Sequence, residues 1–430
     1  MSSSSELVMD GNPSLAEAAR VWWKIGILSF GGPAAQIALM HKEIVENRDW
    51  LSERQFLNAL SFCMLLPGPE AMQLATYAGW RLHGTLGGLL AGLLFVLPGA
   101  AVIMSLATVY SIYGDVPLIA ALFYGIKAAV LVIVVEALLR VAKRALSQKV
   151  HWLVACLAFI GIFFLSIPYP LIVLMSGIFG WFVATTDEGQ QAVDMAHVSV
   201  AKTFSTIAAW LALWLLPLLA LGWLGAPDLL VEVGEFFSTL AIVTFGGAYA
   251  VLAYMAQDVV VQFGWLTAGE MVDALGLAET TPGPLILVTQ FVGFLAGFKE
   301  GGLLLALSAA VVVLWVTFAP CFLWIFAGAP YIEWISAQPR LRGALKAITA
   351  AVVGVILNLS IWFALHVLFA KVNRQQFGPV TLWRPDIATI ESLAAALFLL
   401  SCFLAFRLHW GIIRILLVAA VLGAALRLLL

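Results

Sequence analysis

The chain has 430 residues, of which 63% are hydrophobic and only 11% are charged, and its formal net charge is −2. A soluble domain carries about 25% charged residues, so this composition excludes a water-soluble globular protein. No basic face is present outside short loops, which excludes nucleic-acid binding. The sequence therefore predicts an all-α, polytopic membrane protein that lies in a lipid bilayer.

A polar tail (1–14) precedes an apolar region, 15–80, that Gly and Pro interrupt, so short, discontinuous or re-entrant helices are predicted there. A span needs about 20 helical residues. Apolar stretches of that order follow at 84–112, 117–140, 151–167 and 169–185. A connecting transmembrane helix at 201–224 leads to a second interrupted region, 229–298. The last apolar stretches lie at 301–326, 340–370, 387–406 and 408–430. We expect about 9–11 spans, broken and re-entrant helices included.

The two interrupted regions are related by an internal repeat. A shift of 215 residues aligns Phe30-Gly31-Gly32 with Phe245-Gly246-Gly247, Trp50-Leu51 with Trp265-Leu266, and Pro67-Gly68-Pro69 with Pro282-Gly283-Pro284. Apolar composition alone produces chance matches of Ala and Leu, but not these motifs in register. We therefore divide the chain into a first transmembrane repeat (15–185), a linker with a connecting helix (186–228) and a second repeat (229–430).

The distribution of Lys and Arg indicates how the repeats are oriented. Basic residues gather at 42–54 and 140–149, whereas the stretch 248–298 contains none. Short basic loops stay in the cytoplasm, so equivalent loops of the two halves are predicted to face opposite sides. This is the inverted-topology repeat of secondary transporters, and it places the N-terminus in the cytoplasm.

Each Pro-Gly-Pro must interrupt a helix, because proline removes a backbone donor and clashes with the preceding turn. In hydrocarbon the freed groups cost several kcal/mol each unless protein, a ligand or water satisfies them. Pro69 and Pro284 are predicted to start half-helices, whose N-termini attract anions. The glycine breaks allow close approach of a ligand or of another helix. Tight packing through small residues is the alternative reading of all these motifs.

Several polar residues are candidates for anion or proton binding. Lys127 lies ten residues after Pro117, about 15 Å along a helix and near the bilayer centre, where a Lys costs about 2.5–3.5 kcal/mol. Pairing with a local carbonyl or snorkelling is its alternative role. Lys346 is its repeat equivalent and is either an anion ligand or an ordinary interfacial Lys. Neutral hydrogen bonds to an oxyanion, or bonds between helices, are expected from Gln73, Gln290 and Thr281.

Glu70 and Glu279 flank the two Pro-Gly-Pro motifs. Each is a candidate for proton coupling, and the alternative for Glu70 is a first-turn carboxylate that the helix dipole favours. The four cysteines are scattered, and no Cys/His cluster occurs, so neither a metal site nor a cofactor is predicted. The motifs HExxH and GxSxG are absent, so no enzyme is predicted.

The motifs carry a family resemblance. The first half reads FGGPAAQIALMHKEIV and LLPGPEAMQLATYAGW, the second FGGAYAVLAYMAQDVV and ETTPGPLILVTQFVGF, and both resemble the chromate ion transporter (CHR) family. The resemblance covers most of the chain. It implies a long, two-domain bacterial protein of the inner membrane that exports chromate and gives chromate resistance, with sulfate as a chemical analogue. By motif, it assigns function to Gly31, Gly32, Pro67, Gly68, Pro69, Gly246, Gly247, Pro282, Gly283 and Pro284.

These observations favour a secondary transporter that exports chromate by alternating access between two inverted halves. A proton-coupled importer of sulfate or a related oxyanion is the alternative. A channel is a third hypothesis, and saturable counterflow would distinguish it. The sequence leaves open whether the protein forms a homodimer.

Overall fold

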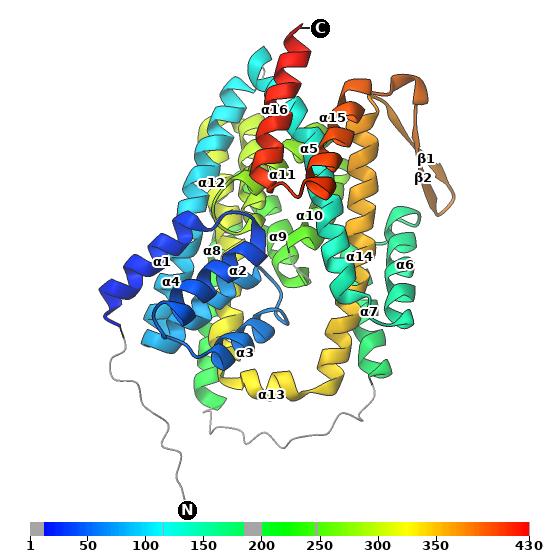
Figure 1. The fold of residues 1–430 in the computed structure, drawn as a ribbon. Helices are drawn as coiled ribbons and strands as arrows, with labels where there is room; N and C mark the ends of the chain where they lie inside the picture. The colour runs from blue at the N-terminus through cyan, green and yellow to red at the C-terminus, as the bar shows by residue number, and fades with distance from the viewer. Residues whose placement is uncertain (1–12, 115, 185–199, 246–247, 430) are drawn as a thin grey trace, which may run out of the picture.

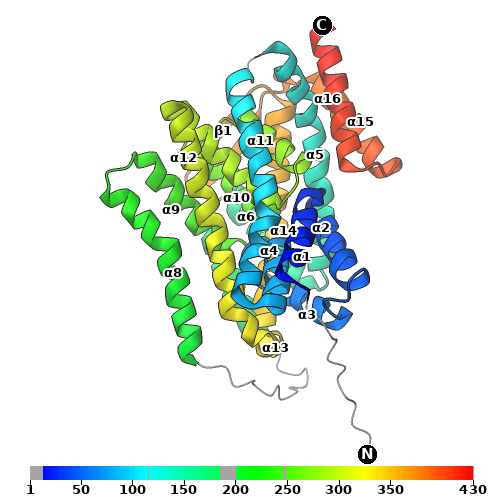
Figure 2. The ribbon, with the colours of Figure 1, turned by 90° about the vertical axis from the view of Figure 1, so that its left-hand side faces the viewer.

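A computed structural model describes residues 13–114, 116–184, 200–245 and 248–429. The first half contains the elements α1 (Leu15–Leu28), α2 (Gly32–His41), η1 (Lys42–Glu46), α3 (Glu53–Cys63), α4 (Glu70–Tyr113), α5 (Pro117–Ala145), α6 (Lys149–Phe163) and α7 (Tyr169–Val183). The connecting helix α8 (Val200–Trp223) lies along the outside of the bundle (Figure 2). The all-α prediction is confirmed.

The second half begins with α9 (Asp228–Val243), α10 (Ala248–Gln257), η2 (Asp258–Gln262), α11 (Ala268–Thr280), η3 (Leu285–Leu287) and α12 (Val288–Gly328). It continues with η4 (Ala329–Tyr331), α13 (Ile332–Ala337), α14 (Pro339–Leu368), β1 (Val372–Phe377), β2 (Val380–Pro385), η5 (Ile387–Thr389), α15 (Ser392–Cys402), η6 (Phe403–Arg407) and α16 (Ile412–Leu429). The element order repeats that of the first half, apart from η3, η4, α13, the antiparallel hairpin β1–β2 and η5 and η6.

Equivalent helices also begin in the same way. Ser52 caps α3 and forms a capping box with Gln55, while Thr267 caps α11 and forms a capping box with Glu270. In each box the hydroxyl accepts from a backbone N–H and the longer side chain accepts from the N-cap N–H, so two unpaired donors are satisfied at once. The π-helical turns η1 and η2 precede these two boxes at matching places.

The long elements α4 and α12 each fold back on themselves. The backbone leaves helical geometry at His83 and Gly84 in α4, and at Gly301 and Gly302 in α12. A methyl group at Gly79 would lie 2.3 Å from the Gly87 carbonyl oxygen, so the limb before the reversal packs tightly against the limb after it. The prediction of re-entrant helices beside full spans is therefore confirmed.

The two halves exchange their last helical hairpins. The α6–α7 hairpin of the first half packs against α14 of the second, and the α15–α16 hairpin of the second packs against α5 of the first (Figure 1). Glycines allow both contacts: a methyl group at Gly180 would lie 2.3 Å from the Gly343 carbonyl oxygen, and one at Gly423 would lie 2.6 Å from Gly125 Cα. Neither half therefore forms a complete bundle alone.

Some predicted spans are shorter than expected. Among the described residues, six helices are long and apolar enough to cross a membrane: α4, α5, α8, the segment Leu285–Tyr331, α14 and α16. The hairpin helices α6 and α7 have 15 residues each and α15 has 11. At 1.5 Å per residue, 15 residues reach about 22 Å, less than the hydrocarbon thickness. The stretches 151–167, 169–185 and 387–406 therefore form apolar helices shorter than a full span, namely Lys149–Phe163, Tyr169–Val183 and Ser392–Arg407, which includes η6.

The first prediction tests the tight reversal of α4. We expect Gly79→Ala to lower the thermal midpoint of the purified protein, because overpacking a close helix contact costs about 1–3 kcal/mol. Gly222→Ala in α8 is the matched control, since no atom lies within 4 Å of the added methyl group. Thermal unfolding followed by tryptophan fluorescence measures both. Equal midpoints for the two variants would show that the limbs of α4 are not in close contact.

Candidate functional site

The Pro-Gly-Pro motifs form one buried break in each half. Gly68 has φ 115° and Gly283 has φ 88°, a region that glycine occupies without strain. Pro69 is the N-cap of α4, and Pro284 is the N-cap of η3, which leads directly into α12. The prediction that helical structure restarts after these two prolines is confirmed.

The Phe-Gly-Gly motifs form the second pair of breaks. In the first half, Gly31 (φ 84°) and Gly32 (φ 76°) separate α1 from α2. In the second half the motif lies between α9 and α10, and its Gly246 and Gly247 lie outside the described residues. Just before the motifs, Ser29 and Thr244 are the C-caps of α1 and α9.

The two kinds of break meet across the halves. The Gly68 N–H donates to the Thr244 carbonyl at 2.8 Å, and the Gly283 N–H donates to the Ser29 carbonyl at 2.9 Å. Each Pro-Gly-Pro loop is therefore bonded to the end of the helix that precedes the Phe-Gly-Gly motif of the other half. The Gln36 side chain reinforces one crossing by donating to the Gly283 carbonyl at 2.7 Å.

This geometry limits which backbone amides can bind an anion at the breaks. The amides of Gly68 and Gly283, which lie at the centre of the two predicted motifs, already donate to protein carbonyls. The amides that lack intrahelical partners by position are those of the first turn after Pro69 and after Pro284. The positive ends of these helices remain at the crossing.

Buried glutamines line both breaks. Gln73 donates through Nε2 to the Pro67 carbonyl at 2.7 Å, and Gln290 donates to the Ala100 carbonyl at 3.1 Å. Among the described residues, the Oε1 atoms of Gln36, Gln73 and Gln290 are buried and have no hydrogen-bond partner. The Thr281 hydroxyl donates to the Ala278 carbonyl three residues earlier, so it serves its own segment. The interior at the breaks therefore retains polar groups that are only partly used.

Lys127 pairs with a carboxylate from the other half. Its Nζ lies 3.1 Å from Oδ2 of Asp273 on α11, and the Tyr110 hydroxyl donates to the same oxygen at 2.8 Å. Asp273 is only 2% exposed, and its Oδ1 has no hydrogen-bond partner among the described residues. An ion pair between a partly exposed Lys and a buried carboxylate thus joins α5 of the first half to α11 of the second.

Asp273 was missed by the sequence reasoning, although a signal was present. It is an acid within the apolar run MVDALGLA, and an ionisable residue at membrane depth indicates function or a specific partner. Neither of the alternative roles of Lys127, pairing with a local carbonyl or snorkelling, describes the ion pair found, and its role as an anion ligand stays a prediction. The partner lies on a different repeat, which spacing along one helix does not reveal.

The two glutamates at the breaks differ in their surroundings. Glu279 is 2% exposed and accepts a hydrogen bond from the Tyr249 hydroxyl at 2.6 Å, while its Oε2 has no partner among the described residues. Glu70 is the first residue of α4 and is partly exposed, which fits a carboxylate at a helix N-terminus. Glu279 is therefore the better placed of the two to take up a proton inside the protein.

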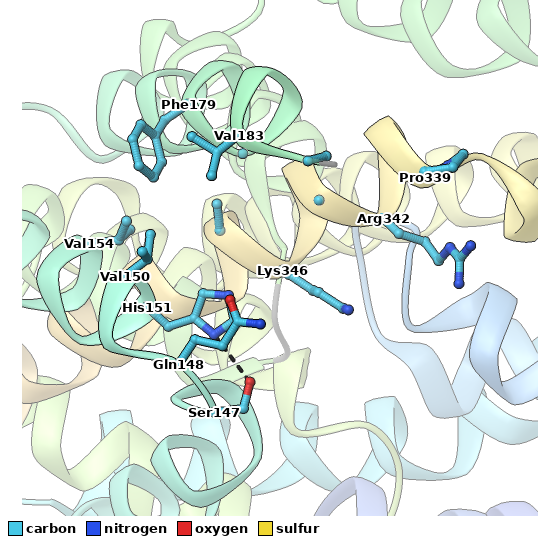
Figure 3. Close-up of a pocket in the computed structure, with 14 residues that line it drawn as sticks. Ser147, Gln148, Val150, His151, Val154, Phe179, Val183, Pro339, Arg342 and Lys346 are labelled. Carbon is cyan, nitrogen blue, oxygen red and sulfur yellow. Dashed lines mark hydrogen bonds between the residues drawn. The ribbon is translucent and has the colours of Figure 1, made fainter. Parts of the chain in front are cut away.

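Lys346 lies in a different place from Lys127. It lines a pocket between α6, α7 and α14, together with Arg342 and His151 (Figure 3). The sequence placed Lys346 near an Arg-rich helix start, and the structure confirms this, since Arg340 and Arg342 occupy the first turn of α14. Lys127 does not line this pocket.

The sequence of both halves matches a known family. The model of the family described as Chromate transporter matches residues 16–181 and 231–424, which make up most of the chain. The chain belongs to the chromate transporter family. The family resemblance inferred from the motifs is therefore confirmed, and the protein is a transporter rather than an enzyme. No solved structure matches this transporter.

Three relatives match most of the transporter. It is 32% identical over 346 residues to a chromate transport protein of Pseudomonas aeruginosa, with 77% of each chain covered. It is 29% identical over 352 residues to a probable chromate transport protein of Synechococcus elongatus, covering 80% of this chain and 83% of that one. It is 27% identical over 344 residues to a chromate transport protein of Cupriavidus metallidurans, covering 80% and 81%.

The buried pair gives the second prediction. We expect Lys127→Met to destabilise the transporter by about 1–3 kcal/mol, because it leaves the buried Asp273 carboxylate without its counter-charge. The double variant Lys127→Met/Asp273→Asn removes both charges and should recover most of that loss. Thermal midpoints of the purified variants measure this. A double variant as unstable as Lys127→Met would show that the two side chains are not coupled.

Proposed function

We propose that this protein is a secondary transporter that exports chromate across the bacterial inner membrane by alternating access and thereby gives chromate resistance. Its relatives that are named chromate transport proteins support the substrate. The observation that carries the mechanism is the reciprocal bonding of the breaks, Gly68 to Thr244 and Gly283 to Ser29. Such paired, discontinuous helices at a repeat interface are where secondary transporters bind their substrates.

The two halves act as inverted repeats in this proposal, with boundaries at 15–185 and 229–430 and with α8 in the linker between them. Three features support the repeat: the matching element order, the matching capping boxes, and the exchange of the α6–α7 and α15–α16 hairpins. The basic residues at 42–54 and their absence from 248–298 support its inversion. In this proposal α8 crosses the membrane once between the two halves, which allows the second half to have the opposite orientation.

The substrate site lies at the crossing of the two breaks. Chromate is a tetrahedral dianion, and the positive ends of α4 and of the η3–α12 segment would neutralise part of its charge. Lys127 lies away from the crossing, beside Tyr110 and Asp273, and in this proposal it supplies a full positive charge on the path of the anion when the anion displaces Asp273 from it. The side chains of Gln73 and Gln290 supply neutral hydrogen bonds to the anion, because each side-chain NH2 has a second N–H beyond the one that bonds the Pro67 or Ala100 carbonyl.

The energetics suit export. A charge that crosses the membrane potential gains about 2.3 kcal/mol per 100 mV, so a dianion that leaves an inside-negative cell gains about twice that value. Export therefore needs neither ATP nor a coupled cation. Import of the same dianion opposes the field and needs coupled positive charge.

The alternative, a proton-coupled importer of sulfate or a related oxyanion, is favoured by one observation. Glu279 is buried, bonded to Tyr249, and has an oxygen with no partner among the described residues. A carboxylate in such a place can take up a proton and so carry the coupled charge.

Flux at imposed potentials tests the function. We expect proteoliposomes containing the transporter to move chromate toward the positive side, with faster flux at larger potential, no effect of a pH gradient, and competition by sulfate. The double variant Lys127→Met/Asp273→Asn should be folded yet slower by about tenfold or more, since a charge-assisted bond to the anion is lost. Gly222→Ala serves as the transport-neutral control. Flux that follows the pH gradient and stops in Glu279→Gln would favour the importer instead.

The inverted topology gives a separate prediction. Asn47 follows the turn η1, and Gln262 is the last residue of the equivalent turn η2. Both residues are exposed. In a background where Cys156 and Cys402 are serine, a membrane-impermeant thiol reagent should label Gln262→Cys in spheroplasts. It should label Asn47→Cys only in inside-out vesicles, because the basic loops of the first half face the cytoplasm. Labelling of both from one side would contradict the inversion.

A further inference from the structure

The helices α5 and α11, one from each half, meet at a glycine. A methyl group at Gly276 of α11 would lie 2.5 Å from Cγ2 of Ile126 and 3.1 Å from Cγ2 of Val130, both on α5. Asp273 precedes Gly276 by three residues and Glu279 follows it by three, and both acids are buried. Residues three apart are neighbours on the surface of a helix. The close contact between the two helices is therefore flanked by one buried acid on each side.

The acid before this contact is paired with a cation of α5. Asp273 Oδ2 lies 3.1 Å from Nζ of Lys127, the residue after Ile126. The Lys127 side chain remains 28% exposed, so an anion can reach it without unfolding either helix. The 140–149 turn at the far end of α5 is predicted to be cytoplasmic. We therefore call Lys127 and Asp273 the outer pair.

The acid after the contact lacks such a partner. Glu279 accepts a hydrogen bond from the Tyr249 hydroxyl at 2.6 Å, and its Oε2 has no hydrogen-bond partner among the described residues. The charges of Arg140 and Glu136, both on α5, act on the Glu279 carboxylate, so these side chains lie in its neighbourhood. Arg140 nevertheless donates to Glu136 Oε1 at 2.8 Å, one turn earlier on its own helix. An arginine near a buried carboxylate thus spends its charge on an exposed one.

The end of α5 also reaches the equivalent place in the first half. Arg144, in the last turn of α5, donates to Met64 Sδ at 3.1 Å. Met64 is the repeat equivalent of Glu279, and each residue precedes its Pro-Gly-Pro motif by three positions. Asn58 is in the same way the equivalent of Asp273. Both places are neutral in α3, so of these two equivalent helices it is α11 that presents acids to the cations of α5.

We infer that Arg140 is a gating residue, which leaves Glu136 and binds Glu279 as an inner pair when the outer pair opens. This inference rests on the proposed alternating access. In the structure the outer pair is formed, while Arg140 is bonded to Glu136 and the inner pair is not made. A tilt of α11 about Gly276 exchanges the two pairs, because the acids lie on opposite sides of this contact. Packed helices with two discrete arrangements are typical elements of such transitions.

The transported anion drives the exchange in this scheme. An oxyanion that binds Lys127 takes the cation away from Asp273, so the outer pair loses its charge-assisted bond. The tilt then brings the free oxygen of Glu279 to Arg140, whose planar guanidinium can hold a carboxylate at two points. The inner pair therefore closes behind the anion as the outer end opens. A ligand shifts an equilibrium only by its different affinity for the two states, and here the difference is the access to Lys127.

Cross-linking between the halves tests the inner pair in the full chain in proteoliposomes. Cys156 and Cys402 are serine, and a protease site in the linker 186–199 separates the halves unless a cross-link joins them. A short bis-methanethiosulfonate linker should join Arg140→Cys to Glu279→Cys. The rate should rise about tenfold when Lys127→Met/Asp273→Asn is added, since the outer pair then holds no charge-assisted bond. Lys143→Cys/Glu279→Cys is the matched control, and its rate should not change. An unchanged rate for Arg140→Cys/Glu279→Cys would overturn the exchange.

Cross-linking at the outer end tests the charge of Arg140. In the same background, Lys127→Cys/Asp273→Cys reports how often the outer ends of α5 and α11 meet. Glu136→Gln should slow this cross-link severalfold, because it releases Arg140 to Glu279. The further change Arg140→Gln should restore the rate, which a merely structural role of Glu136 would not predict. Rates that ignore Glu136→Gln, or that stay slow in Glu136→Gln/Arg140→Gln, would overturn the gating role of Arg140.

The same measurements separate this inference from the proposed function, because cross-linking needs no flux. If wild-type proteoliposomes move no chromate while the cross-linking rates change as expected, the transport proposal fails and the gating pair stands. If chromate flux is as expected and the rates do not change, the gating pair fails and the transport proposal stands.

Discussion

The structure depends on one constraint: a backbone N–H freed by a helix break cannot remain unpaired in hydrocarbon. Each Pro-Gly-Pro motif frees such groups, and each half satisfies its own break with a carbonyl of the other, Thr244 for Gly68 and Ser29 for Gly283. Those carbonyls are available because α1 ends at Leu28 and α9 ends at Val243, which leaves Ser29 and Thr244 as their C-caps. The four interruptions therefore form one cooperative unit, and neither half could bury its breaks alone.

The same dependence appears in the packing. The last hairpin of each half packs against a long helix of the other half. Gly180 and Gly343 form one of these contacts, and Gly125 and Gly423 form the other. The helices joined in this way are in direct backbone contact, whereas the crossing is held by the hydrogen bonds of Gly68, Gly283 and Gln36. The proposed alternating access would move the tightly packed helices as units about this small, polar region.

The sequence predicts the features that single residues dictate. Proline and glycine determine where helices break, so the breaks, the re-entrant limbs of α4 and α12, and the helix starts after Pro69 and Pro284 follow from the motifs. Hydropathy counts apolar residues but does not show where a helix ends, so the short limbs α6, α7 and α15 were expected to be longer. The hairpin β1–β2 lies between the apolar stretches 340–370 and 387–406, where the composition predicted no element. The pairing of Lys127 with Asp273, and the bonding of the Gly68 amide to Thr244, depend on which distant segments meet, and no local pattern encodes that.

The two halves share one order of elements, but they differ in how their charged side chains are placed. Asp273 on α11 neutralises Lys127 on α5. In the proposed mechanism an anion that binds Lys127 must therefore compete with a carboxylate for the same cation. At the periphery, Glu391 of the second half accepts a hydrogen bond from Tyr124 of the first and is the N-cap of α15, whereas the equivalent N-cap of α6 is the neutral Gln148. Two repeats with one element order thus differ in a few side chains that carry or neutralise charge.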